Sequence, residues 1–230
     1  MLPMEARGIR VARQGRTILG PLDLTVAGEG ITVVIGPNGS GKTTLLRALH
    51  GLDRLRDGEV RFAAADARAR QAFVFQSPVL LRRSTRENIA YPLRLRGAQE
   101  IAARVGDVAD RLGLRGLLDQ RAASLSAGEQ QKLALARALV AGPDLLFLDE
   151  PCAALDGAAT RDIEAVLHEA AATGTRIVMS THDMGQARRL AREVVFLHKG
   201  RIGATGPAPG FFEPPPTDEV AAFLRGDILP

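Results

Sequence analysis

The sequence predicts an α/β fold, in which a doubly wound parallel sheet carries an inserted helical segment. Three observations predict it. Short apolar segments alternate with helical ones, a glycine-rich stretch follows an apolar run at Gly36, and the spacing becomes helical from about residue 77 to 140. A chain of 230 residues can form one domain with a substantial core. We therefore expect a single domain over residues 1–230, with a helical subdomain at about 77–140 and a short tail at about 207–230.

The first half of the chain supplies strands and one helix. The apolar run at residues 31–35 is typical of a parallel strand that is buried on both faces. A helix is expected to follow the glycine-rich stretch, from about Lys42 to His50. Further strands are expected at residues 8–12, 22–26, 60–62 and 72–75.

The second half begins with three amphipathic stretches, which start at Arg86, Ile101 and Gly128. Apolar strands separated by helices are then expected at residues 145–148, 177–180 and 194–198. In the tail, prolines between Pro207 and Pro216 interrupt regular structure before a last short helix at about 217–225.

Composition excludes several classes of protein. No apolar run approaches the roughly 18–20 residues of a membrane helix, and the N-terminus lacks the apolar core of a signal peptide. The single cysteine, Cys152, cannot form an intrachain disulfide, so a reducing, cytoplasmic compartment is expected. The net charge is +4, but 27 of the 30 basic residues are arginines spread among 26 acidic ones, and only 4% of residues are aromatic. A nucleic-acid partner is therefore not expected.

The glycine-rich stretch Gly36-Pro-Asn-Gly-Ser-Gly-Lys42-Thr43 fits the complete template of a phosphate-binding loop. Glycines let backbone N–H groups point at phosphate oxygens, and the helix N-terminus adds partial positive charge. Lys42 would contact the β- and γ-phosphates and Thr43 would bind Mg²⁺. An ordinary strand-to-helix turn is the alternative, and the Lys-Thr pair argues against it. The candidate nucleotide-binding residues are Gly36, Pro37, Asn38, Gly39, Ser40, Gly41, Lys42, Thr43 and Thr44.

Two carboxylates end the apolar strand Leu145-Leu-Phe-Leu-Asp149-Glu150. Ligands bind at the carboxyl ends of strands in open α/β sheets, so Asp149 should emerge beside the phosphate loop. It would bind Mg²⁺ directly or through a water molecule. Glu150 can point at the γ-phosphate as the general base for an attacking water. Alone, an acidic strand end before Pro151 could be a simple turn.

The stretch Leu125-Ser-Ala-Gly-Glu129 has two interpretations. Ser126 and Glu129 have the spacing of a capping box at a helix start. The stretch also lies sixteen residues before the strand that carries Asp149, and it continues Gln130-Gln-Lys-Leu-Ala-Leu-Ala-Arg-Ala-Leu139. This run is similar to the signature helix of ATP-binding cassettes. Both interpretations can hold, because a cap fixes the helix start that would face a phosphate.

Together with Ser180-Thr-His182-Asp183, these stretches resemble the ATP-binding cassette (ABC) family over nearly the whole chain. The resemblance implies a P-loop NTPase (RecA-like) core with an antiparallel β subdomain and an inserted α-helical subdomain. Its cofactors would be ATP and Mg²⁺. The implied catalytic residues are Glu150, His182 and Gln76, and the implied Mg²⁺ ligands are Thr43, Gln76 and Asp149. A glutamine at a strand end is commonplace, so the role of Gln76 depends on the resemblance.

In this family two cassettes pair head to tail around two ATP molecules. The resemblance therefore implies a homodimer in which Ser126, Ala127, Gly128 and Glu129 contact the ATP of the partner. Asp156, in the stretch Ala154-Leu155-Asp156, would lie at the dimer interface. The commonest family signature has glycine where Ala127 stands and glutamine where Glu129 stands. We expect the chain to remain active with both replacements.

Most cassettes stack an aromatic residue on adenine ahead of the phosphate loop. The corresponding stretch here, Val11-Ala12-Arg13-Gln14, has no aromatic ring. Arg13 could lay its guanidinium over the base instead. We therefore expect weak base selectivity, with GTP turned over nearly as well as ATP.

The resemblance leaves three classes of protein open: an importer ATPase, an exporter ATPase, and a soluble cassette protein of translation or repair. The last normally has two cassettes or a long coiled coil, and neither is present. The segment from Phe75 to Ile89 resembles that of tungstate and molybdate importers, and more distantly that of phosphate importers. Arg82 and Arg83 within it would form a solvated basic turn or contact the permease.

We therefore expect a transport ATPase at the cytoplasmic face of the cell inner membrane. Its partners would be transmembrane permease subunits and a periplasmic or lipid-anchored substrate-binding protein. The transported solute would be an oxyanion, tungstate or molybdate, with phosphate, another solute or export as alternatives.

Overall fold

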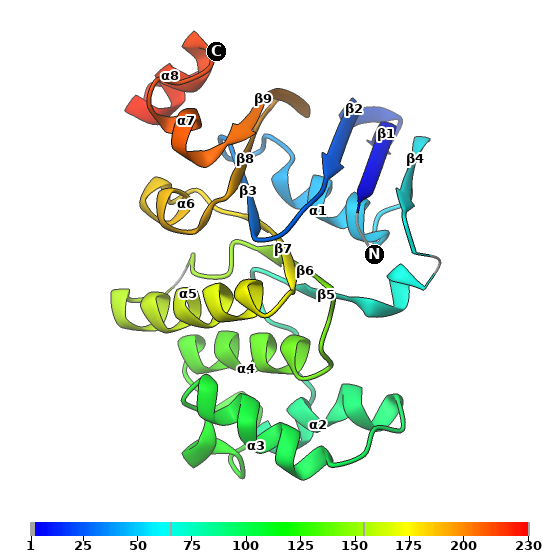
Figure 1. Cartoon of the computed structure of the whole chain (residues 1–230), viewed down its shortest axis with the longest axis vertical. Helices are drawn as coiled ribbons and strands as arrows, with labels where there is room; N and C mark the ends of the chain where they lie inside the picture. The colour runs from blue at the N-terminus through cyan, green and yellow to red at the C-terminus, as the bar shows by residue number, and fades with distance from the viewer. Residues whose placement is uncertain (1–2, 65, 154, 230) are drawn as a thin grey trace.

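The computed structural model describes residues 3–64, 66–153 and 155–229. Six strands form one sheet in the order β5-β6-β7-β3-β8-β9 (Figure 1). The first five strands in this order are parallel, and β9 runs antiparallel to β8. The predicted α/β fold is confirmed. The bounds are β3 Ile31–Ile35, β5 Gln71–Val74, β6 Leu145–Asp149, β7 Arg176–Ser180, β8 Glu193–His198 and β9 Arg201–Pro207.

The central strands are apolar along their length because both faces of the sheet are covered. In β3, Ile31, Val33 and Ile35 pack into the core cluster on one face, whereas Val34 packs into the cluster on the other. This alternation follows from the two-residue period of a strand. Hydrophobic packing on both faces of the sheet therefore fixes the positions of the strand ends.

The second sheet is small and antiparallel, in the order β2-β1-β4. Its strands are β1 Met4–Arg13, β2 Arg16–Val26 and β4 Asp57–Phe62. Helix α1, Lys42–His50, presents leucines to a core cluster that this sheet shares with the large sheet. In Figure 1 the small sheet stands to one side of α1 and the large sheet to the other. The family's antiparallel β subdomain is thus present.

Three helices between β5 and β6 form the lower part of Figure 1: α2 Thr85–Leu95, α3 Ile101–Arg111 and α4 Ala127–Leu139. Short 3₁₀ turns accompany them at Arg115–Leu117 and Ala122–Ser124, and another, Ala67–Arg70, precedes β5. The remaining helices are α5 Gly157–Ala172, α6 Met184–Leu190, α7 Ala208–Phe212 and α8 Asp218–Arg225. Among the described residues, no helix has the length and apolar character to cross a membrane.

The structure adds regular elements where the sequence analysis expected none. The first two strands are longer than expected, because Gln14 (φ 49°) and Gly15 (φ 78°) join them in a two-residue turn with positive φ at both positions. Strand β9 and helix α7 occupy the proline-containing region. Proline is tolerated there because Pro207 stands at the end of β9 and Pro209 in the first turn of α7.

Candidate ATP-binding site

The carboxyl ends of β3, β5, β6 and β7 meet at one edge of the large sheet, where they border a cleft of about 700 Å³. Segments far apart in sequence meet here because parallel neighbours end on the same side. The cleft is lined by Arg13, Ile18, Asn38, Gly39, Gly41, Lys42, Thr43, Thr44, Gln76, Glu150, Ala153 and His182. We call it the phosphate cleft.

The phosphate loop links β3 to α1 along one wall of this cleft. Gly36 has φ 150°, and a Cβ there would come within 2.0 Å of the Leu197 carbonyl oxygen, so only glycine fits. Lys42 is 5% exposed, and its Nζ donates to the carbonyl oxygens of Gly36 (2.9 Å) and Pro37 (3.2 Å). Burial lowers the pKa of Lys42, while the charges of Glu150 and Asp149 act against this shift. A buried cation held mainly by neutral carbonyls is ready for an anionic partner.

Gly36, Pro37 and Ser40 belong to the same loop but are not among the residues that line the cleft. Ser40 is buried, and Ser40 N donates to the Pro37 carbonyl oxygen at 3.1 Å. These residues therefore shape the turn, while the loop residues from Asn38 onward, other than Ser40, face the cleft.

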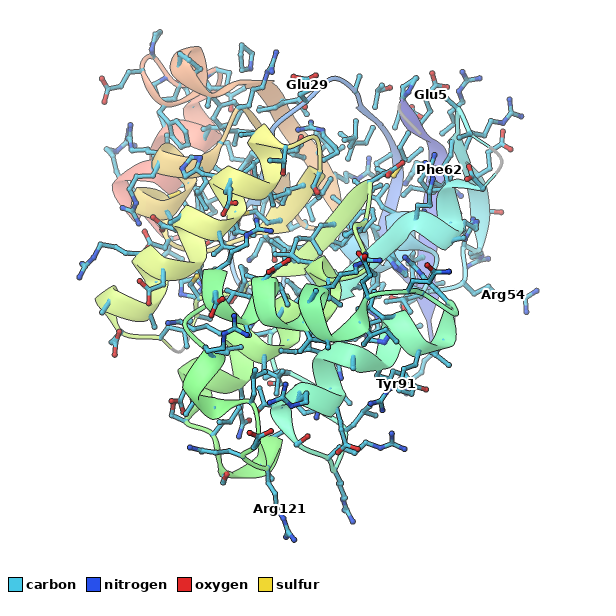
Figure 2. The ribbon with its side chains drawn as sticks, turned by 60° about the horizontal axis from the view of Figure 1, so that its bottom comes forward. Glu5, Glu29, Arg54, Phe62, Tyr91 and Arg121 are labelled. Carbon is cyan, nitrogen blue, oxygen red and sulfur yellow. The ribbon has the colours of Figure 1, made fainter. Side chains whose placement is uncertain are left out.

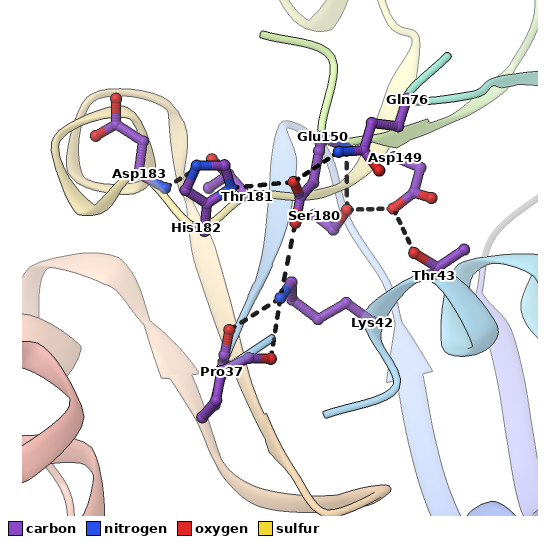
Figure 3. Close-up of polar contacts among 11 residues, drawn as sticks. Pro37, Lys42, Thr43, Gln76, Asp149, Glu150, Ser180, Thr181, His182 and Asp183 are labelled. Atoms are coloured by element: carbon purple, nitrogen blue, oxygen red, sulfur yellow. Dashed lines mark hydrogen bonds and ion pairs between the residues drawn. The ribbon is translucent and has the colours of Figure 1, made fainter. Parts of the chain in front are cut away.

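Asp149 ends β6 and is 4% exposed. Its Oδ1 accepts hydrogen bonds from Thr43 Oγ1 at 3.1 Å and from Ser180 Oγ at 2.7 Å (Figure 3). The register aligns Asp149 with Ser180 on the neighbouring strand β7. A carboxylate, a hydroxyl and the nearby Gln76 amide are the oxygen donors that Mg²⁺ prefers, so these residues fit the ion.

Glu150 is the residue on which the other polar side chains converge (Figure 3). Its Oε2 accepts from Gln76 Nε2 at 3.3 Å and lies 3.0 Å from His182 Nδ1. Its Oε1 lies 3.7 Å from Lys42 Nζ. Glu150 has φ 45°, a conformation that costs a non-glycine residue on the order of 1–3 kcal/mol.

A second, smaller cleft of about 300 Å³ lies at the start of α4. It is lined by Ser126, Ala127, Gly128, Glu129, Lys132, Leu155, Asp156 and Ala159, and we call it the signature cleft. None of these residues lines the phosphate cleft of the same chain. Asp156 Oδ1 caps α5 by accepting from the Ala158 and Ala159 backbone N–H groups at 2.9 and 2.8 Å. Ala154, expected in the same loop, lies outside the described residues.

The capping interpretation of Ser126 and Glu129 is confirmed. Ser126 Oγ accepts from Glu129 N at 3.4 Å, and Glu129 Oε2 accepts from Ser126 N at 2.8 Å. The phosphate interpretation concerns a second chain and remains a prediction.

The structure brings three residues to the site that the sequence analysis did not assign: Ser180, Ile18 and Ala153. Ser180 is fully buried; besides donating to Asp149, its Oγ accepts from Glu150 N at 3.0 Å. A hydroxyl at the end of an apolar strand was the available signal. Ile18 lines the cleft from β2. The available signal for Ile18 was the Gln14-Gly15 pair, because a turn there starts the second strand at Arg16 and not at Leu22.

Arg13 lines the cleft from the end of β1, and its stacking on the base remains a prediction. Its Nη2 contacts Asp53 Oδ2 at 3.3 Å, and Asp53 Oδ1 also accepts from Arg47 Nε at 3.0 Å. The guanidinium is therefore held at the rim of the cleft by an acidic residue, while its side chain stays 59% exposed.

A phosphate loop at a parallel sheet edge, facing an Asp-Glu pair, defines a P-loop nucleotide hydrolase. Residues 19–153 match the family model described as ABC transporter. The chain is 43% identical over 204 residues to the tungstate uptake system ATP-binding protein TupC of Peptoclostridium acidaminophilum, covering 86% of this chain and 94% of the relative. It is 39% identical to the Fe(3+) ions import ATP-binding protein FbpC of Streptomyces avermitilis, over 99% of this chain and 68% of the relative.

A solved structure described as the ATP binding subunit of an ABC transporter superposes with a TM-score of 0.84 at 25% identity, covering 97% of this chain and all of the other. The chain therefore belongs to the ABC transporter family. As a member of that family it binds ATP and is a transport-coupled ATP hydrolase.

Proposed function

We propose that Glu150 is the general base of this ATPase and that two copies of the chain pair head to tail to power an oxyanion importer. One observation carries the catalytic part: Lys42, Gln76 and His182 all lie within 3.7 Å of the Glu150 carboxylate. A carboxylate with three positioned partners can hold and orient an attacking water.

Each residue has a separate task in this proposal. Lys42 exchanges the loop carbonyls for β- and γ-phosphate oxygens. Glu150 accepts a proton from water as its oxygen attacks the γ-phosphorus and the bond to the bridging oxygen breaks. Gln76 and His182 hold the Glu150 carboxylate and the water in line.

Thr43, Asp149 and Gln76 would hold Mg²⁺, which when bound neutralises charge on the β- and γ-phosphates. Asp149 Oδ1 already accepts from Thr43 Oγ1, so the two oxygen donors lie together before any ion binds. The buried hydroxyl of Ser180 keeps the Asp149 carboxylate in this orientation.

The Glu150→Gln variant tests the catalytic proposal. An amide cannot take the proton, so turnover should fall by about 10²–10⁴-fold while ATP binding persists. The ATP-loaded variant should accumulate as a dimer, measured by light scattering after size exclusion. Turnover close to that of the wild type would exclude Glu150 as the base. An ATP-loaded variant that stays monomeric, where a control cassette dimerises, would exclude the head-to-tail pair.

The permease would dock in an apolar groove of about 250 Å³ between β5 and the helical segment. Val79, Tyr91 and Leu95 line the groove and are 68%, 38% and 70% exposed. Tyr91 extends outward from α2 (Figure 2). A short permease helix with an apolar face fits such a groove. Arg82 and Arg83 follow the lining residue Leu81 and would contact the same partner.

We propose tungstate or molybdate as the solute. The support is the segment from Phe75 to Ile89, which resembles that of tungstate and molybdate importers, together with the identity to TupC. The identity to FbpC, whose name specifies ferric ions, favours iron as a second candidate. The chain would then act at the cytoplasmic face of the inner membrane, with permease subunits and a substrate-binding protein that selects the solute.

Elemental analysis tests the solute. Cells with and without this gene would be grown with trace tungstate, molybdate and ferric iron at limiting phosphate. Selective loss of tungsten or molybdenum is expected. Selective loss of iron or phosphorus would instead assign the importer to that solute and overturn the tungstate proposal.

A further inference from the structure

The signature cleft contains an arrangement that conflicts with phosphate binding. Ser126 Oγ and Ser126 N both donate to the same oxygen, Glu129 Oε2, at 2.8 Å each. A serine hydroxyl has one hydrogen to donate, and phosphate oxygens at neutral pH are mainly acceptors. The hydroxyl can therefore serve a phosphate only after it leaves Glu129.

The charge of Glu129 adds to the conflict. Hydrogen bonds from Ser126 lower the pKa of Glu129, so this partly exposed side chain is ionised at neutral pH. The cation in the same cleft, Lys132, is engaged with Asp162 at 2.6 Å. Asp156, which also lines the cleft, is a second acid. An incoming γ-phosphate thus meets two carboxylates and a lysine that already has a counter-ion.

We propose that the Glu129 carboxylate opposes ATP-driven pairing of two chains, by retaining the Ser126 hydroxyl hydrogen and by repelling the partner's γ-phosphate. This inference rests on the head-to-tail dimer proposed above. Glu129 is then a residue that weakens the closed dimer, rather than a contact that strengthens nucleotide binding.

A glutamine at this position would act differently at nearly the same size. Its carbonyl oxygen can still accept from Ser126 N, so the cap on α4 is retained. The amide is neutral, which removes the repulsion, and it competes less strongly than a carboxylate for the Ser126 hydroxyl. The replacement should therefore strengthen pairing without disturbing the helix start.

The test compares Glu150→Gln with the double variant Glu150→Gln/Glu129→Gln, each loaded with ATP and Mg²⁺. Analytical ultracentrifugation gives the monomer–dimer dissociation constant. We expect the double variant to dimerise at least about tenfold more tightly, because like charges a few ångströms apart are removed at two symmetric sites. Added salt should strengthen the dimer of the single variant more than that of the double variant, because screening weakens the same repulsion.

The chain contains a matched control. Ser84 and Glu87 form the same capping box at the start of α2, with Glu87 Oε2 accepting from Ser84 N at 3.2 Å and from Ser84 Oγ at 3.3 Å. Glu87→Gln in the Glu150→Gln background should leave dimerisation unchanged. Thermal unfolding of all variants checks that each is folded.

Two results would contradict the inference in distinguishable ways. Dimerisation that is equal or weaker in the double variant, while Glu150→Gln still dimerises, would overturn the role of Glu129 alone. Failure of the Glu150→Gln parent to dimerise would overturn the head-to-tail mechanism and the inference with it.

Discussion

The phosphate cleft and the signature cleft each contain a donor side chain that could bind phosphate, Lys42 and Ser126. The two donors differ in the acceptors that they contact. In the phosphate cleft the cation Lys42 is buried; its Nζ donates to two neutral carbonyl oxygens and lies farther, at 3.7 Å, from the Glu150 carboxylate. In the signature cleft the donor Ser126 already has a charged acceptor in Glu129, and both lie in contact with solvent. The first cleft is therefore organised to bind phosphate by itself, whereas the second has to exchange an existing hydrogen bond before it can do so.

The largest expected effect is a difference between variants of the two clefts in the ATP affinity of the monomer. Lys42→Ala should lower kcat by about 10²–10³-fold and weaken ATP binding by the monomer, because the buried positive charge is lost. Ser126→Ala should also lower turnover, but it should leave the ATP affinity of the monomer within about twofold. Fluorescent-nucleotide titration at protein concentrations below dimerisation gives the affinities, and phosphate release gives the turnover.

Loss of monomer ATP affinity in Ser126→Ala would mean that the two clefts are not independent within one chain. Ser84→Ala, at the matched cap of α2, controls for general effects of altering a helix start.

A smaller effect is expected at Ser180, which supports the phosphate cleft from within the sheet. Ser180→Ala removes the hydrogen bond to Asp149 Oδ1 and an acceptor of Glu150 N, and it should lower the free energy of unfolding by about 1–3 kcal/mol. We expect kcat to fall about tenfold and the Mg²⁺ concentration needed for half-maximal rate to rise.

The control for Ser180→Ala is Val34→Ala, at the position that pairs with Ser180 from β3. It should destabilise the fold by leaving a cavity, with the Mg²⁺ dependence unchanged. If Ser180→Ala and the wild type needed the same Mg²⁺ concentration for half-maximal rate, Ser180 would have a packing role only.

The smallest expected effect is the preference for adenine over guanine as the base of the nucleotide. The residues that line the described phosphate cleft include no Phe, Tyr or Trp, and Arg13 there is paired with Asp53. With no aromatic stacking partner to favour adenine, kcat/KM for GTP should lie within about tenfold of that for ATP. Steady-state phosphate release with each nucleotide measures this ratio. A larger preference for ATP would point to a base contact that neither Arg13 nor Ile18 explains.

The fold and much of the phosphate cleft could be predicted because their signals are local. The glycines before Lys42 and the apolar strand before Asp149 each specify a backbone path within a few residues. Ser180 was missed because its role depends on the register between β6 and β7, which a single segment does not reveal. The edge strand β9 was missed because proline at its end resembled a break in regular structure.

The signature cleft was predicted in part. The capping spacing of Ser126 and Glu129 was readable, since it involves four consecutive residues. The competition between Glu129 and a phosphate for the Ser126 hydroxyl hydrogen could not be predicted from the sequence. It depends on which oxygen of Glu129 accepts and on the ion pair of Lys132 with Asp162.

The pairing of Asp149 with Ser180 ties the residue count of β7 to the geometry of the phosphate cleft. Side chains alternate faces along a strand, so one inserted residue within β7 would turn the Ser180 hydroxyl away from the Asp149 carboxylate while preserving an apolar, foldable strand. The residue count of β7 is therefore constrained by the site at its carboxyl end, in a way that its apolar composition is not.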